Sequence, residues 1–460
     1  MKKLMAFILL VVTVLSLSSC ENTTPIEEKE ALPVVNQSSV SSTVTSAAEK
    51  KYNENYFQMG ELPETSSFVS SSAPASSSKP QPEREEILSL TYNGYYYKNL
   101  SVAQKRIYKL IDAAVFNMTI GYIELGKCNY SDILLAFKAV MQDRPEYFWM
   151  SNEYILSTQS NGEYKIAFSG VKGDDMDYLV TRQERSSMQT ALSSAYLEVK
   201  ALADTVPTDY EKELIVHDWL VNRAVYDEET EKNYSKNMSK ESKLSFTSYG
   251  GMVRREGKLE SVAVCEGYAR AFQYILNRMG IECTIIGGKV DGQGHLWNAV
   301  KIDSKWYNVD VTLNDADGDC LHTYFNVTDK QLSLTHESDK DFYDVKISIV
   351  EKGSFNLFKP ECTANKYNYY VVNSTVISSL SNSAETIAKK IEQNYDLGVC
   401  EFSFSQSVNY SYNANTVMDT VNVDKIIELI EKSKGVKLAF RAVGATGAKS
   451  FKLYWMPSIV

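Results

Sequence analysis

The chain has 460 residues, of which 44% are hydrophobic and 23% charged, and its formal net charge is −10. This length exceeds what one hydrophobic core usually organises, so we expect two or three domains. The acidic balance and the absence of a dense Lys/Arg stripe exclude nucleic acid as a partner, because phosphate binding requires a basic face.

The first twenty residues have the pattern of an export leader. Lys2 and Lys3 precede an apolar run, Leu4–Leu17, that is too short for an ordinary transmembrane helix. The run ends in Leu17-Ser18-Ser19-Cys20, which resembles the lipobox of bacterial lipoproteins and implies cleavage before Cys20 and lipid on its thiol. The alternative is an ordinary secretory signal with a chance cysteine. We expect residues 1–20 to be a lipoprotein signal peptide outside any fold, and the protein to be lipid-anchored on the extracytoplasmic side of the cell membrane.

Residues 21–85 are rich in Ser, Thr, Pro and Glu, most clearly between Ser66 and Pro82. Such a composition buries too little apolar surface to offset the entropy lost on ordering. The segment is predicted to be a disordered tether that separates the folded part from the membrane.

Residues 86–203 are expected to form an N-terminal α+β domain without recognisable chemistry. Ser101 is a predicted helix N-cap with Gln104 at the third helical position, and Asn161-Gly162 predicts a turn between strands. The pattern predicts helices over 101–115, 131–141 and 181–202, and strands over 147–149, 154–156 and 164–168.

Residues 204–340 hold the side chains that point to chemistry. Thr208 and Glu211 form a predicted capping box for a helix that ends near Arg223. Cys265 begins another predicted helix, whose apolar positions recur every three to four residues and stop at Gly280. Unpaired N–H groups and the dipole at a helix N-terminus favour the thiolate, which is the nucleophilic form of cysteine. A buried, inert cysteine is the alternative.

His295 and Asp310 lie on two predicted strands, Gly294–Ile302 and Lys305–Val311, with Asp303-Ser304 as the turn between them. The register of a two-residue turn places Asp310 diagonally across from His295 on the same face. Diagonal neighbours are about 7–8 Å apart, close enough for an imidazole and a carboxylate to meet. A three-residue turn would destroy this arrangement.

Cysteine catalysis uses a set of this kind. A histidine takes the thiol proton, and an acid fixes the histidine tautomer and stabilises the imidazolium. We therefore predict Cys265 as the nucleophile, His295 as the base and Asp310 as the orienting acid. The backbone N–H of Cys265 and, more weakly, the side chain of Tyr249 are the candidate oxyanion donors.

The same residues resemble the signature blocks of the bacterial transglutaminase-like superfamily. The blocks are VCEGYA at 264–269, GHLWN at 294–298 and WYNVDVT at 306–312, and the segments around His217 and His336 resemble flanking parts. The resemblance covers about 205–340. It implies an α+β, papain-like core in which a helix carrying the cysteine packs on an antiparallel sheet carrying the histidine and the aspartate.

Other candidate ligands have plainer interpretations. His217 lies within the helix that follows Thr208 and is expected to be a packed histidine. The acidic run Asn314–Asp319 lacks the closing Glu of an EF-hand loop, so we expect a solvated loop instead of a calcium site. No metal and no other cofactor is predicted. A disulfide between Cys362 and Cys400 stays open, without support from their spacing.

Residues 341–460 are expected to form a C-terminal α/β appendage. The pattern predicts strands over 367–377, 400–404, 436–441 and 451–454, and helices over 384–393 and 423–434.

The sequence thus predicts a surface-anchored cysteine enzyme that acts on amide or peptide bonds through a thioester. Its partner would be a protein or peptide substrate, with cell-wall peptide as one candidate. Transfer to water makes a peptidase or amidase, and transfer to a lysine makes a transamidase. A solvent-facing cleft slightly favours hydrolysis, but the residues do not decide between the two. The alternative from another class is an inactive scaffold for cell-surface binding or adhesion.

Overall fold

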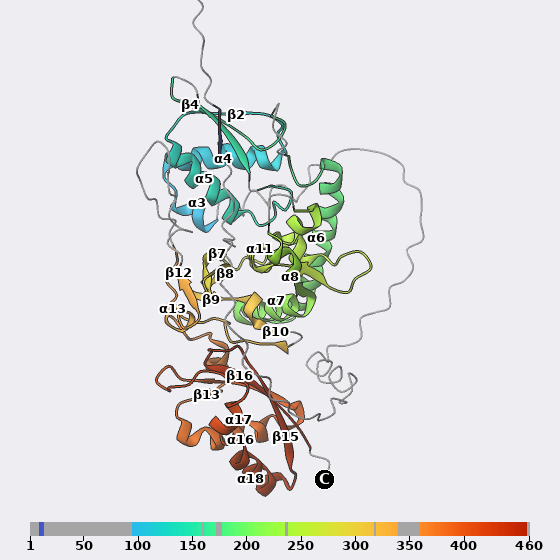
Figure 1. Cartoon of the computed structure of the whole chain (residues 1–460), viewed down its shortest axis with the longest axis vertical. Helices are drawn as coiled ribbons and strands as arrows, with labels where there is room; N and C mark the ends of the chain where they lie inside the picture. The colour runs from blue at the N-terminus through green and yellow to red at the C-terminus, as the bar shows by residue number, and fades with distance from the viewer. Residues whose placement is uncertain are drawn as a thin grey trace, which may run out of the picture.

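The computed structural model describes residues 9–12, 94–151, 153–158, 161–171, 177–234, 238–316, 319–338 and 359–457. Cys20 and the predicted tether at 21–85 lie outside these ranges. Within them, no helix combines the length and the apolar character needed to cross a bilayer. Figure 1 shows three groups of elements along the long axis of the molecule.

The group at one end combines three helices with a four-stranded sheet. The helices are α3 (Tyr95–Asn99), α4 (Val102–Phe116) and α5 (Tyr130–Asp143). The strands are β1 (Leu9–Val12), β2 (Ile123–Lys127), β3 (Tyr154–Thr158) and β4 (Glu163–Ala167), in the order β1-β3-β4-β2. The predicted capping box at Ser101 and Gln104 is present. The long helix α6 (Arg182–Ala203) leads to the middle of the molecule.

One expectation for this part was wrong. Residues 147–149 form consecutive turns instead of a strand, with Tyr147 N–H donating to the Arg144 carbonyl and Met150 N–H to the Tyr147 carbonyl. Burial of the aromatic rings decided this conformation rather than strand propensity. Leu9–Val12, inside the predicted signal peptide, pairs antiparallel with β3 in the uncleaved chain, and removal of residues 1–20 stays a prediction.

The middle group packs helix α11 (Cys265–Arg278) against an antiparallel sheet. The sheet has the order β12-β7-β8-β9, formed by β12 (His336–Ser338), β7 (Cys283–Val290), β8 (Gln293–Ile302) and β9 (Lys305–Val309). Helix α7 (Asp209–Arg223) begins at the predicted Thr208 capping box and packs on α11. This helix-on-sheet arrangement is the α+β core that the sequence predicts.

Short elements complete the middle group. The helices are α8 (Glu228–Lys232), α9 (Lys240–Leu244), α10 (Ser248–Met252), α12 (Val311–Asn314) and α13 (Asp329–Leu332). The strands form two small pairs, β5 (Ala224–Tyr226) with β6 (Ser261–Ala263) and β10 (Asp315–Ala316) with β11 (Asp319–Cys320).

The C-terminal group is a four-stranded sheet with helices. The strands are β13 (Val376–Ile377), β14 (Val399–Phe404), β15 (Leu438–Val443) and β16 (Ser450–Pro457), in the order β13-β14-β16-β15. The helical elements are α15 (Tyr369–Val372), η2 (Leu380–Asn382), α16 (Ser383–Gln393), η3 (Tyr395–Leu397), α17 (Val417–Thr420) and α18 (Val423–Lys434). The prediction of one strand over 367–377 was wrong. The Asn368 side chain caps helix α15, and only Val376–Ile377 forms a strand.

The buried hydrophobic residues in the described ranges form two clusters. One cluster contains buried residues between Tyr96 and Tyr370 and joins the N-terminal and middle groups. The other lies within the C-terminal sheet and its helices. Cys362 belongs to the first cluster, Cys400 packs against the second, and both are free thiols. The open possibility of a disulfide between them is therefore not realised.

Candidate active site

Cys265 lies at the N-terminus of α11, as predicted, and is 6% exposed. The preceding residue, Val264, is extended and donates its N–H to the carbonyl oxygen of Ser245 at 3.1 Å. Gly267 permits this close approach, because a Cβ at that position would lie 2.3 Å from the same oxygen. The first turn of α11 leaves N–H groups without helical partners and directs the positive end of its dipole toward the sulfur.

The hairpin of β8 and β9 has the predicted register, with Ile302 opposite Lys305. Asp303 and Ser304 both have positive φ, 48° and 63°, as a two-residue type I′ turn requires. Strand β9 ends at Val309, and the next residue is the N-cap of α12.

Asp310 therefore lies just beyond its strand, and its Oδ2 is 2.7 Å from Nε2 of His295. Its other oxygen, Oδ1, accepts the N–H of Leu313 at 3.0 Å, so the short helix α12 holds the carboxylate in place. Because Nε2 of His295 faces the acid, Nδ1 is the ring nitrogen left for the hydrogen bond between His295 and Cys265. Cysteine, histidine and aspartate thus come together from a helix, a strand and a helix cap.

The electrostatics of this set favour a charged pair. Burial disfavours a charged ring, but the Asp310 carboxylate and the Cys265 sulfur raise the pKa of His295 well above its usual range. Burial likewise disfavours an ionised carboxyl, but the two histidines that Asp310 contacts hold its pKa well below the usual value. A protonated His295 therefore lies between an ionised Asp310 and the Cys265 sulfur.

A second histidine contacts the acid and was missed as a site residue. Nε2 of His336, on β12, is 2.9 Å from the same Oδ2 of Asp310, and its Nδ1 is 2.9 Å from the Thr335 hydroxyl. The His336 ring packs edge-on against Trp297, with ring centres 5.0 Å apart. The resemblance of the Thr335-His336 segment to a family flank was the only signal of it in the sequence. Asp310 is therefore oriented from two sides.

The predicted oxyanion donors differ in their support. The N–H of Cys265 belongs to the first turn of α11, which leaves it free of a helical partner. Tyr249 lies on α10 with its ring against Phe148, at 5.2 Å between ring centres, and burial raises its pKa. Among the contacts of the described residues, none joins the Tyr249 hydroxyl to Cys265.

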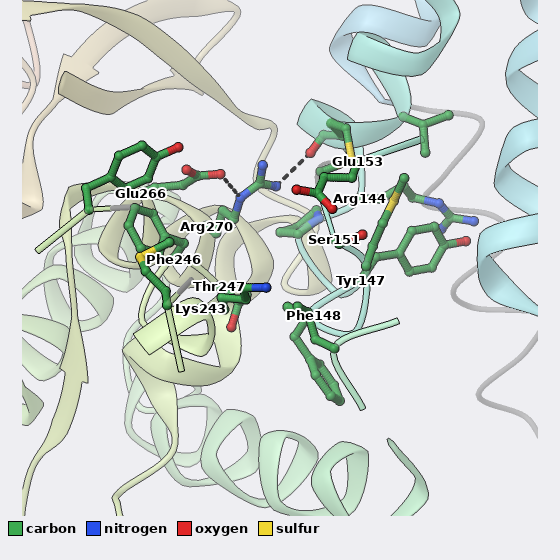
Figure 2. A pocket seen from close by; sticks show the side chains of 17 residues that line it. Arg144, Tyr147, Phe148, Ser151, Glu153, Lys243, Phe246, Thr247, Glu266 and Arg270 are labelled. Carbon is green, nitrogen blue, oxygen red and sulfur yellow. Dashed lines mark hydrogen bonds and ion pairs between the residues drawn. The ribbon is translucent and has the colours of Figure 1, made fainter. Parts of the chain in front are cut away.

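A recess opens beside the first turn of α11, on the side of the N-terminal group. It encloses about 880 Å³, including the space at its mouth. Figure 2 shows Glu266, the residue after Cys265, paired with Arg270 on its wall, with 2.8 Å between Oε1 and Nε. Buried Oε2 of Glu266 and buried Oγ of Ser151 lack hydrogen-bond partners within the described residues. Cys265, His295 and Asp310 are not among the residues that line this recess, so it is a separate hollow and not the cleft of the triad.

Two groups in the described part of the chain bring metal-ligating atoms within 4.8 Å of one another. One is His295, Asp310 and His336, in which both imidazoles already bond the carboxylate. The other is His217, Asp218, Cys320 and His322. The expected packed histidine, His217, belongs to this buried cluster.

Hydrogen bonding fixes the protonation of His217. Asn314 Oδ1 accepts the backbone N–H of Tyr324, so its Nδ2 donates to Nε2 of His217. Nδ1 of His217 must then carry the proton and donate to Asp218, at 2.8 Å. A metal at Nδ1 would displace this proton and require an imidazolate, so this donor set does not fit a metal ion.

The acidic run Asn314–Asp319 was expected to be a solvated loop, and two of its carboxylates have partners in the fold. Asp315 Oδ2 accepts the Tyr268 hydroxyl at 2.5 Å, and buried Asp319 accepts from Arg441 at 3.1 Å. Asp317 lies outside the described residues.

Comparison with known proteins agrees with this geometry. A family model described as the transglutaminase-like superfamily matches residues 199–311, about a quarter of the chain, which includes Cys265, His295 and Asp310. No curated protein matches the chain.

Four solved chains are similar to this one, and two of them have informative names. One is a TGase, with 16% identity and a TM-score of 0.24 over 40% of this chain and 48% of that one. The other is named "Putative Cysteine Protease from Cytophaga hutchinsonii", with 16% identity and a TM-score of 0.20 over 35% of this chain and 61% of that one. The chain thus spans less than two thirds of either protein. The family match covers the helix that carries Cys265 and much of the antiparallel sheet on which it packs. The region around residues 199–311 is therefore transglutaminase-like, with an α+β papain-like core.

Proposed function

We propose that this chain is a cysteine enzyme that cleaves an amide or peptide bond through a thioester on Cys265. The observation that carries the proposal is the meeting of His295 with Asp310 at 2.7 Å and with Cys265 at the helix N-terminus. A cysteine at this position with a protonated histidine beside it is primed as a nucleophile.

The reaction runs in two halves. The Cys265 thiolate attacks the carbonyl carbon, and the oxyanion that forms is stabilised by N–H groups at the start of α11. His295 gives its proton to the departing amine as the C–N bond breaks, which leaves a thioester and a neutral ring. The neutral ring then takes a proton from water or from an amine as that nucleophile attacks the thioester, and the thiolate returns. Throughout, Asp310 keeps the Nε2 proton of His295 in place, so that Nδ1 faces the sulfur.

The substrate is proposed to be a protein or peptide at the cell surface, with cell-wall peptide as a candidate, and hydrolysis as the favoured outcome. The leader pattern that ends at Cys20 supports export and lipid anchoring.

Thiol labelling tests the proposal. Iodoacetamide should alkylate Cys265 faster than the five other described cysteines, and His295→Ala should abolish that preference. Mass spectrometry of surface peptides exposed to wild type and to Cys265→Ala then separates cleavage from cross-linking. Labelling of Cys265 no faster than that of Cys128, together with unchanged peptides, would favour the inactive scaffold instead.

A further inference from the structure

A buried cluster of charges connects the transglutaminase-like region to the C-terminal sheet. His322, 3% exposed, has both ring nitrogens on carboxylates: Nδ1 is 2.9 Å from Glu401 Oε1, and Nε2 is 2.9 Å from Asp218 Oδ1. Its backbone N–H also donates to Glu401 Oε2 at 3.0 Å. Glu401 lies on β14 and Asp218 on α7, so this one ring joins two groups of elements.

His322 carries a positive charge in this position. Burial lowers its pKa, but the carboxylates of Glu401 and Asp218 outweigh burial and raise it to about 9. Lys452 on β16 adds a second cation, 3.7 Å from Glu401 Oε1, and donates to the Cys320 carbonyl at 2.7 Å. Two carboxylates and two cations balance, which a buried ionic cluster requires.

The cluster continues to the catalytic acid through hydrogen bonds. Asp218 accepts from neutral His217, which accepts from Asn314 at the end of α12. Asn314 Oδ1 accepts the N–H of Tyr324 at 3.0 Å, and the Tyr324 carbonyl accepts the N–H of Asp310 at 3.0 Å. Asp310 and Asn314, the two ends of this short segment, are therefore both held by hydrogen bonds that lead back to the cluster.

The Tyr324 ring makes a second connection to the same acid. It packs against His336, with ring centres 5.0 Å apart, and His336 donates to the carboxylate of Asp310. A displacement of the loop that holds Tyr324 would move the backbone of Asp310 and one of its two imidazole partners together.

We propose that Glu401 and His322 are positioning residues for the proposed reaction, through which docking of the C-terminal sheet holds Asp310 in register with His295. This inference rests on the proposed function. It gives the C-terminal group a role in the active site, although no contact is recorded between its described residues and the triad.

The test uses the full chain in detergent and the rate of Cys265 alkylation by iodoacetamide from pH 5 to 10. Glu401→Gln keeps the side-chain shape and removes the charge that holds His322. We expect the rate at pH 7 to fall about tenfold and the profile to move toward that of a free thiol, which is only a few per cent thiolate at pH 7. Ile430→Val, in the C-terminal core but outside the cluster, is the control: it should lower Tm and leave the profile unchanged.

If Glu401→Gln does not fold, Tyr370→Phe provides a milder perturbation. It removes the hydroxyl that donates to Glu401 Oε2 at 3.2 Å and that also bonds Ser450 and Thr323, and it leaves the charge of Glu401 in place. It should lower the rate about two- to threefold with the same direction of shift. A wild-type profile retained in a folded Glu401→Gln or Tyr370→Phe variant overturns the inference and leaves the proposed function standing. A wild-type Cys265 that reacts like a free thiol refutes the proposed function itself.

Discussion

Replacement of Asp310 by asparagine tests the geometry most directly. The carboxylate is fully buried, and each oxygen has a defined partner: Oδ1 accepts the Leu313 N–H, and Oδ2 faces Nε2 of both His295 and His336. In Asp310→Asn the amide oxygen can keep the Leu313 bond only if the NH₂ group takes the place of Oδ2. The N–H groups of the amide would then face the Nε2–H groups of His295 and His336, so that donors meet donors.

His295 then loses the Nε2 proton and keeps the one on Nδ1, which faces Cys265 and can no longer accept the thiol proton. Without an imidazolium or a base beside it, the sulfur should react about as slowly as a free thiol, of which only a few per cent is thiolate at pH 7. In wild type the raised pKa of His295 keeps an imidazolium next to the sulfur, so alkylation at pH 7 should slow by about tenfold or more in the variant. Above pH 9 the two rates should converge.

The assay is the second-order rate of iodoacetamide labelling at Cys265, followed by peptide mass spectrometry so that the other cysteines are counted separately. Asp303→Asn, in the exposed turn of the same hairpin, is the matched control and should react like wild type. A folded Asp310→Asn variant that labels within threefold of wild type at pH 7 would refute the ion-pair reasoning.

Four further outcomes are expected. Because the pKa of Asp310 is lower in the folded than in the unfolded protein, its ionisation stabilises the fold above about pH 4, and this contribution is lost as the pH falls toward the folded-state pKa. The difference in unfolding free energy between wild type and Asp310→Asn, measured in urea, should therefore shrink from pH 7 to pH 3. Gly267→Ala should destabilise by about 1–3 kcal/mol in urea, because its Cβ meets a backbone oxygen; a gain, as at an ordinary helix glycine, would contradict the close approach. Ser304→Gly should raise the unfolding free energy by about 0.5–1 kcal/mol, because the residue has φ 63°; no gain in Tm would argue against that turn. Cys20→Ala should move the protein from the membrane fraction to the soluble fraction, and retention in the membrane would exclude lipid at this residue as the only anchor.

Local rules account for the parts of the site that the sequence predicted. The capping boxes at Ser101 and Thr208 involve residues three apart, and the register of the β8–β9 hairpin follows from a two-residue turn. The position of Cys265 at a helix start depends on the helix that follows it. Each of these features is set by neighbours within one turn or one hairpin, so the chain itself specifies them.

Packing between distant segments decided the rest. The aromatic run at 147–149 has strand propensity, yet burial of its rings favoured turns. His336 reaches Asp310 only because β12 pairs with β7, and Glu401 meets His322 only because β14 docks across a gap of 79 residues. The sequence by itself determined the helix start at Cys265 and the hairpin register that brings His295 to Asp310. Tertiary structure alone decided what holds the acid, because partners far apart in the chain leave no periodic signal in sequence.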